Sequence, residues 1–150
     1  MKSRLLFVLA SLLLVLAVLP LLRAPKAAID WKYSPEQAFG QAGDEGLPVL
    51  VFLYTDWCTY CRQMDETTFS DPEVVSEMAT DFVWLRLNAE TDPEGTRLQK
   101  RFFVSGFPTL LILDSTGKEI DRLQGYVPPR QFALAVKARV PTRESAFLTR

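Results

Sequence analysis

Apolar and polar positions divide the chain into an apolar leader and a region in which short apolar runs alternate with amphipathic segments. Residues 48–54 form a continuous apolar run rich in β-forming side chains, which predicts a strand buried on both faces. Three further strands are predicted over residues 82–87, 109–114 and 118–124. The last two form a hairpin through the turn Ser115-Thr116-Gly117.

Helices are predicted between these strands, where capping residues precede amphipathic segments. Ser34-Pro35-Glu36-Gln37 combines an N-cap serine, a proline at the first helical position and a capping-box glutamine. The helices are predicted from residue 34 to between Gly40 and Gly46, and over 58–66, 71–79, 92–103 and 128–140. This order of elements predicts an α/β fold with a mixed central sheet of about four strands flanked by helices. Its core is expected to include Phe82, Trp84, Phe102 and Phe103.

The apolar leader predicts export of the rest of the chain. Residues 5–22 carry no charge and lie between basic residues on both sides, a length that suits a marginal transmembrane helix or a long signal-peptide core. Residues 23–28 are a poor cleavage site, which favours an uncleaved signal-anchor over a cleaved signal peptide. The expected organisation is a leader over 1–23, a linker over 24–33, one domain over 34–140 and a loose tail over 141–150.

The charge of the exported part argues against nucleic-acid binding. Without residues 1–29 the chain has 13 basic and 18 acidic residues, a net charge of −5. No run of basic residues interleaved with aromatics is present in the sequence.

The chain has two cysteines, Cys58 and Cys61, and no histidine. A structural zinc site needs four ligands, nearly always Cys or His, so this chain could hold zinc only if a second chain completed the shell. The absence of histidine also excludes Cys-His and Ser-His hydrolase chemistry. A purely structural disulfide remains an alternative, but a bridge that closes so short a loop gains little unfolded-state entropy. Thiol–disulfide exchange is therefore the favoured chemistry.

Two short motifs carry a family resemblance. Trp57-Cys58-Thr59-Tyr60-Cys61 follows a predicted buried strand, and Gly106-Phe107-Pro108-Thr109 precedes the predicted hairpin. This pattern resembles the thioredoxin superfamily. Residues 54–58 and 67–74 are in addition similar to the C-terminal periplasmic thioredoxin-like domain of DsbD-type thiol:disulfide interchange proteins. The resemblance covers roughly residues 47–138 and implies a thioredoxin fold that passes electrons by disulfide exchange outside the cytoplasm.

The residue types suggest roles for the two thiols and their neighbours. Cys58 opens a predicted helix, where backbone N–H groups favour the thiolate and lower its pKa, so we expect it to be the attacking thiol. Cys61 lies about one helical turn further on and is expected to resolve the mixed disulfide. Trp57 is expected to form an apolar platform beside Cys58, and Tyr60 to tune the redox pair and contact substrate. Pro108 resembles the cis-proline of the superfamily, which implies that it and Phe107 contact an extended substrate segment.

One acidic residue and one missing acidic residue bear on proton handling. Asp65 lies four residues after Cys61 and seven after Cys58, which places all three on one stripe of a regular α-helix. Its carboxylate could take the proton of Cys61 and raise the thiol pKa values, or it could be an ordinary solvated acid. The related domains carry a buried aspartate six residues before the first cysteine, where this chain has Phe52.

These features together predict a membrane-tethered protein-disulfide reductase at the periplasmic face of a bacterial inner membrane. Expected partners are disulfide-containing exported proteins, including apocytochrome c, and a membrane thiol-electron donor of DsbD type. No cofactor and no metal are expected. The alternatives are a disulfide oxidase or isomerase, a non-catalytic thioredoxin-fold binding or assembly module, and a zinc-bridged dimer.

Overall fold

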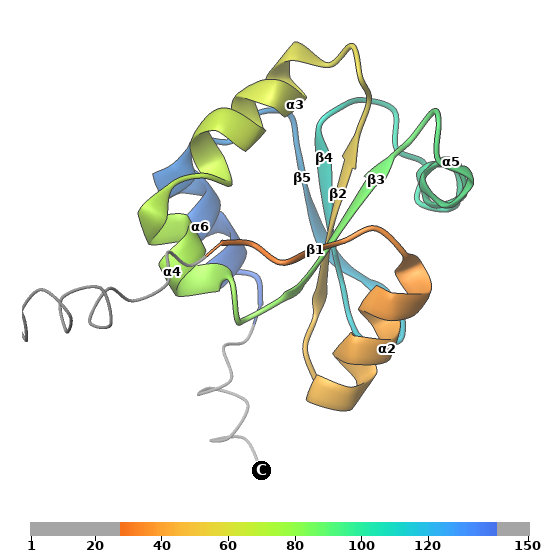
Figure 1. The fold of residues 1–150 in the computed structure, drawn as a ribbon, viewed down its shortest axis with the longest axis horizontal. Coiled ribbons are helices and arrows are strands. Elements are labelled where there is room, and N and C mark those ends of the chain that lie inside the picture. Colours follow the sequence, from red (N-terminus) through yellow and green to blue (C-terminus); the bar gives the residue numbers. More distant parts are fainter. Residues whose placement is uncertain (1–27, 141–150) are drawn as a thin grey trace, which may run out of the picture.

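The structure is a computed structural model that describes residues 28–140, and it contains eleven helices and strands in that range. Figure 1 shows their arrangement in space. In chain order the elements are β1 (Trp31–Lys32), α2 (Pro35–Glu45), β2 (Val49–Tyr54), α3 (Thr59–Gln63), the π-helix η1 (Met64–Thr68), α4 (Pro72–Met78), β3 (Val83–Asn88), α5 (Pro93–Arg101), β4 (Thr109–Leu113), β5 (Glu119–Gln124) and α6 (Pro129–Lys137).

The predicted mixed α/β sheet is confirmed, but it has five strands rather than about four. The strand order is β1-β3-β2-β4-β5, in which β1 and β2 run parallel to β3, β4 is antiparallel to β2 and β5 is antiparallel to β4. The added strand, β1, lies within the segment 24–33 that was predicted to be a linker. Two residues are too few to show an alternating pattern, and β1 forms because Trp31 pairs with Trp84 of β3.

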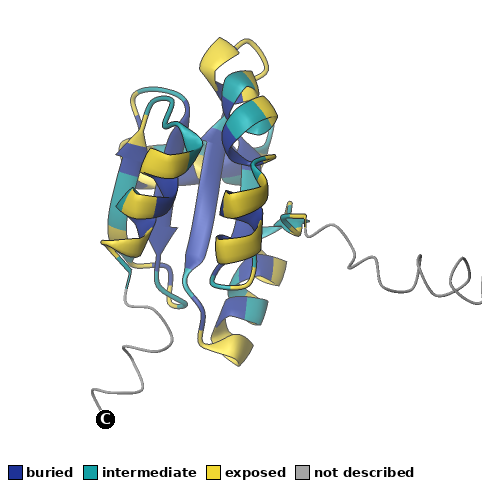
Figure 2. Ribbon diagram, turned by 90° about the vertical axis from the view of Figure 1, so that its left-hand side faces the viewer, coloured by how far each residue is buried: buried dark blue, intermediate teal, exposed yellow. Residues whose placement is uncertain are grey.

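Each face of the sheet carries an apolar cluster, because the side chains of a strand alternate between its two faces. Figure 1 shows α3, α4 and α6 on one face of the sheet, and α2 and α5 on the other. Leu50 and Phe52 of β2 belong to the first cluster, whereas Val49, Val51 and Leu53 belong to the second. Strand β2 is therefore buried on both sides, as its continuous apolar run predicted, and Figure 2 shows the exposed residues on the outward sides of the helices.

The predicted helix starts are confirmed at three positions. Ser34, Asp71 and Asp92 are N-caps whose side chains accept hydrogen bonds from backbone N–H groups of the first turn, and a proline follows each cap. Helix α2 ends at Gly46, which adopts a left-handed conformation at φ 65°.

One of the four predicted core aromatics is wrong. Phe82, Trp84 and Phe102 are buried, but Phe103 is 88 % exposed. Phe103 follows the C-cap of α5 with φ 53°, and the next backbone N–H, that of Val104, donates to the Gln99 carbonyl. This helix ending buries Val104 and turns the Phe103 side chain outward. A helical pattern extended past its true end therefore placed Phe103 in the core.

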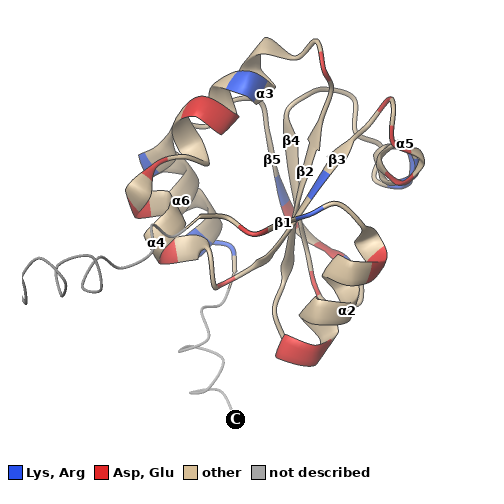
Figure 3. Ribbon diagram, in the orientation of Figure 1, with Lys and Arg blue, Asp and Glu red and all other residues tan. Residues whose placement is uncertain are grey.

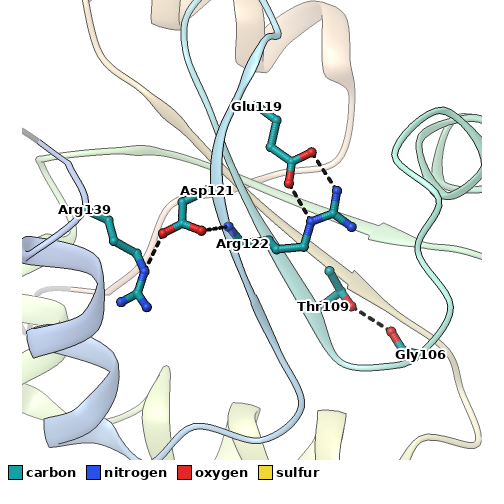
Figure 4. A network of polar contacts seen from close by, with 6 residues as sticks. All are labelled: Gly106, Thr109, Glu119, Asp121, Arg122 and Arg139. Atoms are coloured by element: carbon teal, nitrogen blue, oxygen red, sulfur yellow. Dashed lines mark hydrogen bonds and ion pairs between the residues drawn. The ribbon is translucent and has the colours of Figure 1, made fainter.

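Polar contacts attach β5 to the end of the last helix. Asp121 of β5 forms an ion pair with Arg139, just after α6, and also accepts a hydrogen bond from the Arg122 backbone N–H (Figure 4). Arg122 forms a bidentate ion pair with Glu119 at 2.5 and 2.6 Å. Strand β5 is half-exposed along most of its length, so these pairs lie at the surface.

Within residues 28–140, no helix is long and apolar enough to cross a bilayer. The predicted leader over 1–23 and the predicted tail over 141–150 lie outside the residues that the structure describes.

The ending of α5 predicts a stabilising substitution. Phe103→Gly should raise the free energy of unfolding by up to about 1 kcal/mol, because a left-handed backbone costs a side chain with a Cβ roughly this much and the exposed ring loses little packing. The measurement is urea unfolding of the oxidised protein. Phe103→Ala is the matched control, since it removes the same ring but keeps the Cβ. Equal stability of the two variants would contradict this explanation.

Candidate functional site

The two cysteines lie where the buried strand β2 ends and α3 begins. A turn over Thr55–Cys58 connects these elements, and the Cys58 backbone N–H donates to the Thr55 carbonyl at 3.2 Å. Cys58 is the N-cap of α3, and Cys61 lies within that helix. A disulfide joins their sulfur atoms, with an S–S distance of 2.12 Å. Both side chains are buried, at 4 % and 2 % exposure.

The helix start provides a hydrogen bond to one of the two sulfurs. The backbone N–H of Cys61 donates to Cys58 Sγ at 3.0 Å. A donor held at this position by the backbone would stabilise negative charge on Cys58 once the disulfide is reduced. The geometry therefore distinguishes the two cysteines and favours Cys58 as the nucleophile.

Arg62 is a site residue that was not predicted. Its guanidinium donates to the Asp56 carbonyl at 3.0 Å and to Thr59 Oγ1 at 3.2 Å, and so bridges the turn before the cysteines and the first residue of α3. Its position directly after Cys61 was the one sequence feature from which a role at the site could have been predicted. Arg62 adds a positive charge on the active-site helix, where Thr59 and Tyr60 supply none.

Asn88, at the end of β3, is a second residue that was not predicted. Its amide donates to Asp56 Oδ1 at 2.9 Å, and its carbonyl accepts from the backbone N–H groups of Glu90 and Thr91 at 3.0 and 3.2 Å. Glu90 in turn accepts a hydrogen bond from Trp57 Nε1 at 3.0 Å. Asn88 therefore joins the turn before Cys58 to the loop after β3. One asparagine at a strand end carries no motif from which this role could be predicted.

The predicted substrate-binding residues differ in exposure. Trp57 precedes Cys58, Tyr60 lies between the two cysteines, and they are 65 % and 61 % exposed. Phe107 is half-buried, and its ring lies edge-on to the Trp57 ring with the centroids 6.3 Å apart. The Phe107–Pro108 peptide bond is cis, as the resemblance implied, and Pro108 is buried. The hydroxyl of Thr109 donates to the Gly106 carbonyl at 2.7 Å and closes the loop around this pair (Figure 4).

Asp65 lies in the π-helix η1 rather than in a continuous α-helix. The stripe predicted for Cys58, Cys61 and Asp65 assumed regular α-helical spacing, which ends at Gln63. Both Asp65 oxygens accept hydrogen bonds from the Arg86 guanidinium of β3, at 2.6 and 2.7 Å. Phe52 occupies the β2 position at which the related domains carry a carboxylate. It pairs in register with Arg86 of β3, and its ring centre lies 4.9 Å from that of Phe69.

No group of three or more His, Cys, Asp or Glu side chains is arranged to hold a metal ion within the part of the chain that the structure describes. The chemical groups that the site contains are the sulfur pair, the N–H donor to Cys58 and the packed rings of Trp57 and Phe107.

The Asn88 contacts predict a stability effect. Asn88→Ala should lower the free energy of unfolding by about 2–3 kcal/mol, because it removes the partners of the Asp56 carboxylate and of two backbone N–H groups. Asn88→Asp is the matched variant: it keeps an acceptor for the N–H groups but opposes Asp56 with a second carboxylate. Urea unfolding at neutral pH measures both, and wild-type stability for Asn88→Ala would refute this role.

Known proteins share this fold and motif. The thioredoxin-like domain family matches residues 35–139. A curated protein named thiol:disulfide interchange protein DsbD, from Pseudoalteromonas atlantica, is 36 % identical over 106 residues, which cover 68 % of this chain and 18 % of that protein. The chain thus spans less than a fifth of the length of this relative.

Solved structures of thioredoxin-like proteins are also similar to this chain. A thioredoxin from Thermus thermophilus is 31 % identical, with a TM-score of 0.66 that covers 74 % of this chain and 86 % of that one. The oxidised C-terminal domain of DsbD from Neisseria meningitidis is 25 % identical, with a TM-score of 0.61 and coverage of 70 % and 92 %. The structural likeness thus extends over most of this chain and most of each of these two structures.

Proposed function

The chain belongs to the thioredoxin-like family and contains a domain of the thiol:disulfide oxidoreductase type, with its cysteines joined as a disulfide; from this premise we propose that the protein is a membrane-tethered, extracytoplasmic protein-disulfide reductase. The observation that carries the proposal is the hydrogen bond from the Cys61 N–H to Cys58 Sγ at 3.0 Å. It supplies what an attacking thiolate needs, a fixed donor at a helix start beside a second sulfur.

The reaction begins with the reduced pair. The Cys58 thiolate attacks one sulfur of the partner's disulfide, a new S–S bond forms, and the partner's other sulfur leaves as a thiolate and takes a proton. Cys61 then loses its proton and attacks Cys58 Sγ, which closes the Cys58–Cys61 disulfide and releases the partner's second thiolate. Two electrons pass from this chain to the partner, together with the Cys61 proton, and the partner's remaining thiolate takes a proton from solvent. The oxidised pair must afterwards be reduced by a dithiol donor.

The exposed aromatic residues fit the docking of a partner. Trp57 and Tyr60, next in sequence to the buried cysteines, expose large aromatic side chains, and the Phe107 ring from the loop before β4 packs edge-on against Trp57. We assign Trp57, Tyr60, Phe107 and Pro108 to substrate contact. Because Cys58 is only 4 % exposed, a partner disulfide must approach closely over this surface before exchange begins.

The cellular setting of the proposal derives from the sequence. Residues 5–22 would hold the chain at the membrane, residues from 24 onward would lead to the domain, and the domain would face the periplasm. Exported disulfide proteins or apocytochrome c would be the substrates. A membrane thiol-electron donor of DsbD type would return the pair to its reduced form.

Trapping of the intermediate tests the order of attack. Cys61→Ser should accumulate a mixed disulfide through Cys58 with a defined protein disulfide such as insulin, because the resolving sulfur is absent. Cys58→Ser is the matched control and should trap at least about tenfold less, a difference that non-reducing gel electrophoresis measures. Equal trapping by both variants would contradict the assignment of Cys58 as nucleophile.

The same variants distinguish a reductase from a binding module in cells. A double Cys58→Ser, Cys61→Ser variant should lose the cellular role entirely if exchange is the function. If the double variant retains that role, the domain acts by binding alone and the reductase proposal fails.

A further inference from the structure

The surroundings of Arg86 are unusual for a charged residue. Arg86 lies in β3, a strand that is otherwise uncharged, and Figure 3 shows this basic segment close to the middle of the sheet. Its side chain is 20 % exposed. The guanidinium carbon lies 4.5 Å from the ring centre of Tyr54 and 5.3 Å from that of Phe52. Two aromatic rings of β2 thus hold the cation by packing and by cation–π attraction.

The same guanidinium is paired with one carboxylate. Arg86 donates two parallel hydrogen bonds to Asp65, at 2.6 and 2.7 Å, and the Asp65 side chain is 31 % exposed. Burial acts to lower the pKa of Arg86, but the hydrogen bonds and charge of Asp65, and then the side chain of Tyr54, raise it above its ordinary value. The guanidinium therefore keeps its charge at all physiological pH values.

The position of Asp65 connects this pair to the redox site. Asp65 follows Cys58 by seven residues, in the π-helix η1 that directly continues α3. An unpaired carboxylate in this segment, partly shielded from solvent, would oppose negative charge on Cys58. The bidentate guanidinium cancels this charge and leaves neither Asp65 oxygen without a hydrogen-bond donor.

We propose that Arg86 is a positioning residue for thiol–disulfide exchange, which clamps Asp65 onto β3 and neutralises it, so that the Cys58 thiolate forms without a competing negative charge. The inference rests on the proposed function, since it concerns the nucleophile of that reaction. It argues against one of the two roles left open for Asp65, that of accepting the Cys61 proton, because both carboxylate oxygens already accept hydrogen bonds from Arg86. Strand β2 has Phe52 where the related domains carry a carboxylate, and the Phe52 ring packs against the Arg86 guanidinium.

Other charged groups lie near the sulfur pair and remain unchanged in the test. Asp56 accepts from Asn88, Glu90 accepts from Trp57, Arg62 bridges Asp56 and Thr59, and Glu66 is exposed on η1. None of them contacts Arg86 or Asp65 in the hydrogen bonds and ion pairs of residues 28–140. A change at Arg86 or Asp65 therefore leaves these other contacts in place.

The test is a charge cycle measured on the full-length protein. The apparent pKa of the Cys58 thiol is obtained from the pH dependence of its alkylation by iodoacetamide. Arg86→Gln should raise the pKa of Cys58 by about half a unit, because the Asp65 charge is no longer neutralised. At pH values below that pKa, alkylation should be about threefold slower. Asp65→Asn should lower the pKa of Cys58 by a similar amount, since the cation remains. The double variant, without either charge, should return to the wild-type value.

Two further variants separate charge from structure. Arg86→Lys keeps the positive charge but cannot form the bidentate hydrogen bonds to Asp65. It should lower the free energy of unfolding while leaving the pKa of Cys58 within about 0.2 units of wild type. Arg122→Gln breaks a similar bidentate pair on β5 with Glu119 and should leave that pKa unchanged.

The outcomes are distinct. Opposite shifts in the two single variants and recovery in the double variant support the proposal. Shifts of the same sign in both single variants, or no shift in either, overturn it, while the reductase function stands as long as the wild-type pair still exchanges with a protein disulfide. If the wild-type pair does not exchange at all, the proposed function itself fails.

Discussion

The hydrogen bond from the Cys61 backbone to Cys58 Sγ depends on the burial of one strand. Strand β2 is fixed on both edges by β3 and β4 and on both faces by apolar clusters, so its end has a defined position. The short turn after Tyr54 then places Cys58 at the N-cap of α3, where the Cys61 backbone N–H donates to its sulfur. Apolar burial of β2 is therefore the constraint that creates the redox site, and chemistry on Cys58 follows from where that strand ends.

The neighbouring strand β3 controls the same site by other means. Asn88 at its end holds the turn before Cys58 through Asp56, and Arg86, two residues earlier on the same face, holds the helical segment after Cys61 through Asp65. One polar and one charged side chain of a largely apolar strand thus fix the active-site segment on both sides of the cysteines. Burial of a polar side chain lowers stability unless the side chain is hydrogen-bonded. Arg86 and Asn88 both meet this condition, because each donates hydrogen bonds to its aspartate at 2.6–2.9 Å.

The strands of six residues and the capped helices could be predicted from sequence, because a buried run such as Val49–Tyr54 and caps such as Asp71-Pro72 depend on local chemistry alone. The cysteines could be predicted for the same reason, since their spacing defines their chemistry. Three features depend on contacts distant in sequence and could not be predicted. Strand β1 forms by pairing with β3, Arg86 meets Asp65 across 21 residues, and the left-handed ending of α5 turns Phe103 outward. The change from α-helix to π-helix at Met64 has no signal in the pattern of apolar residues, although it decides where Asp65 lies.

The reduction potential of the Cys58–Cys61 pair tests the central claim most directly. The protein is equilibrated in thiol–disulfide buffers of known potential, quenched in acid and alkylated, and the reduced fraction is measured by mass; with only two cysteines in the chain, the result has one interpretation. A reductase should give a potential of roughly −230 to −270 mV, in the range of glutaredoxins and thioredoxin. A potential near −120 mV, that of a strong oxidant, would reverse the proposed direction of electron flow and contradict the account.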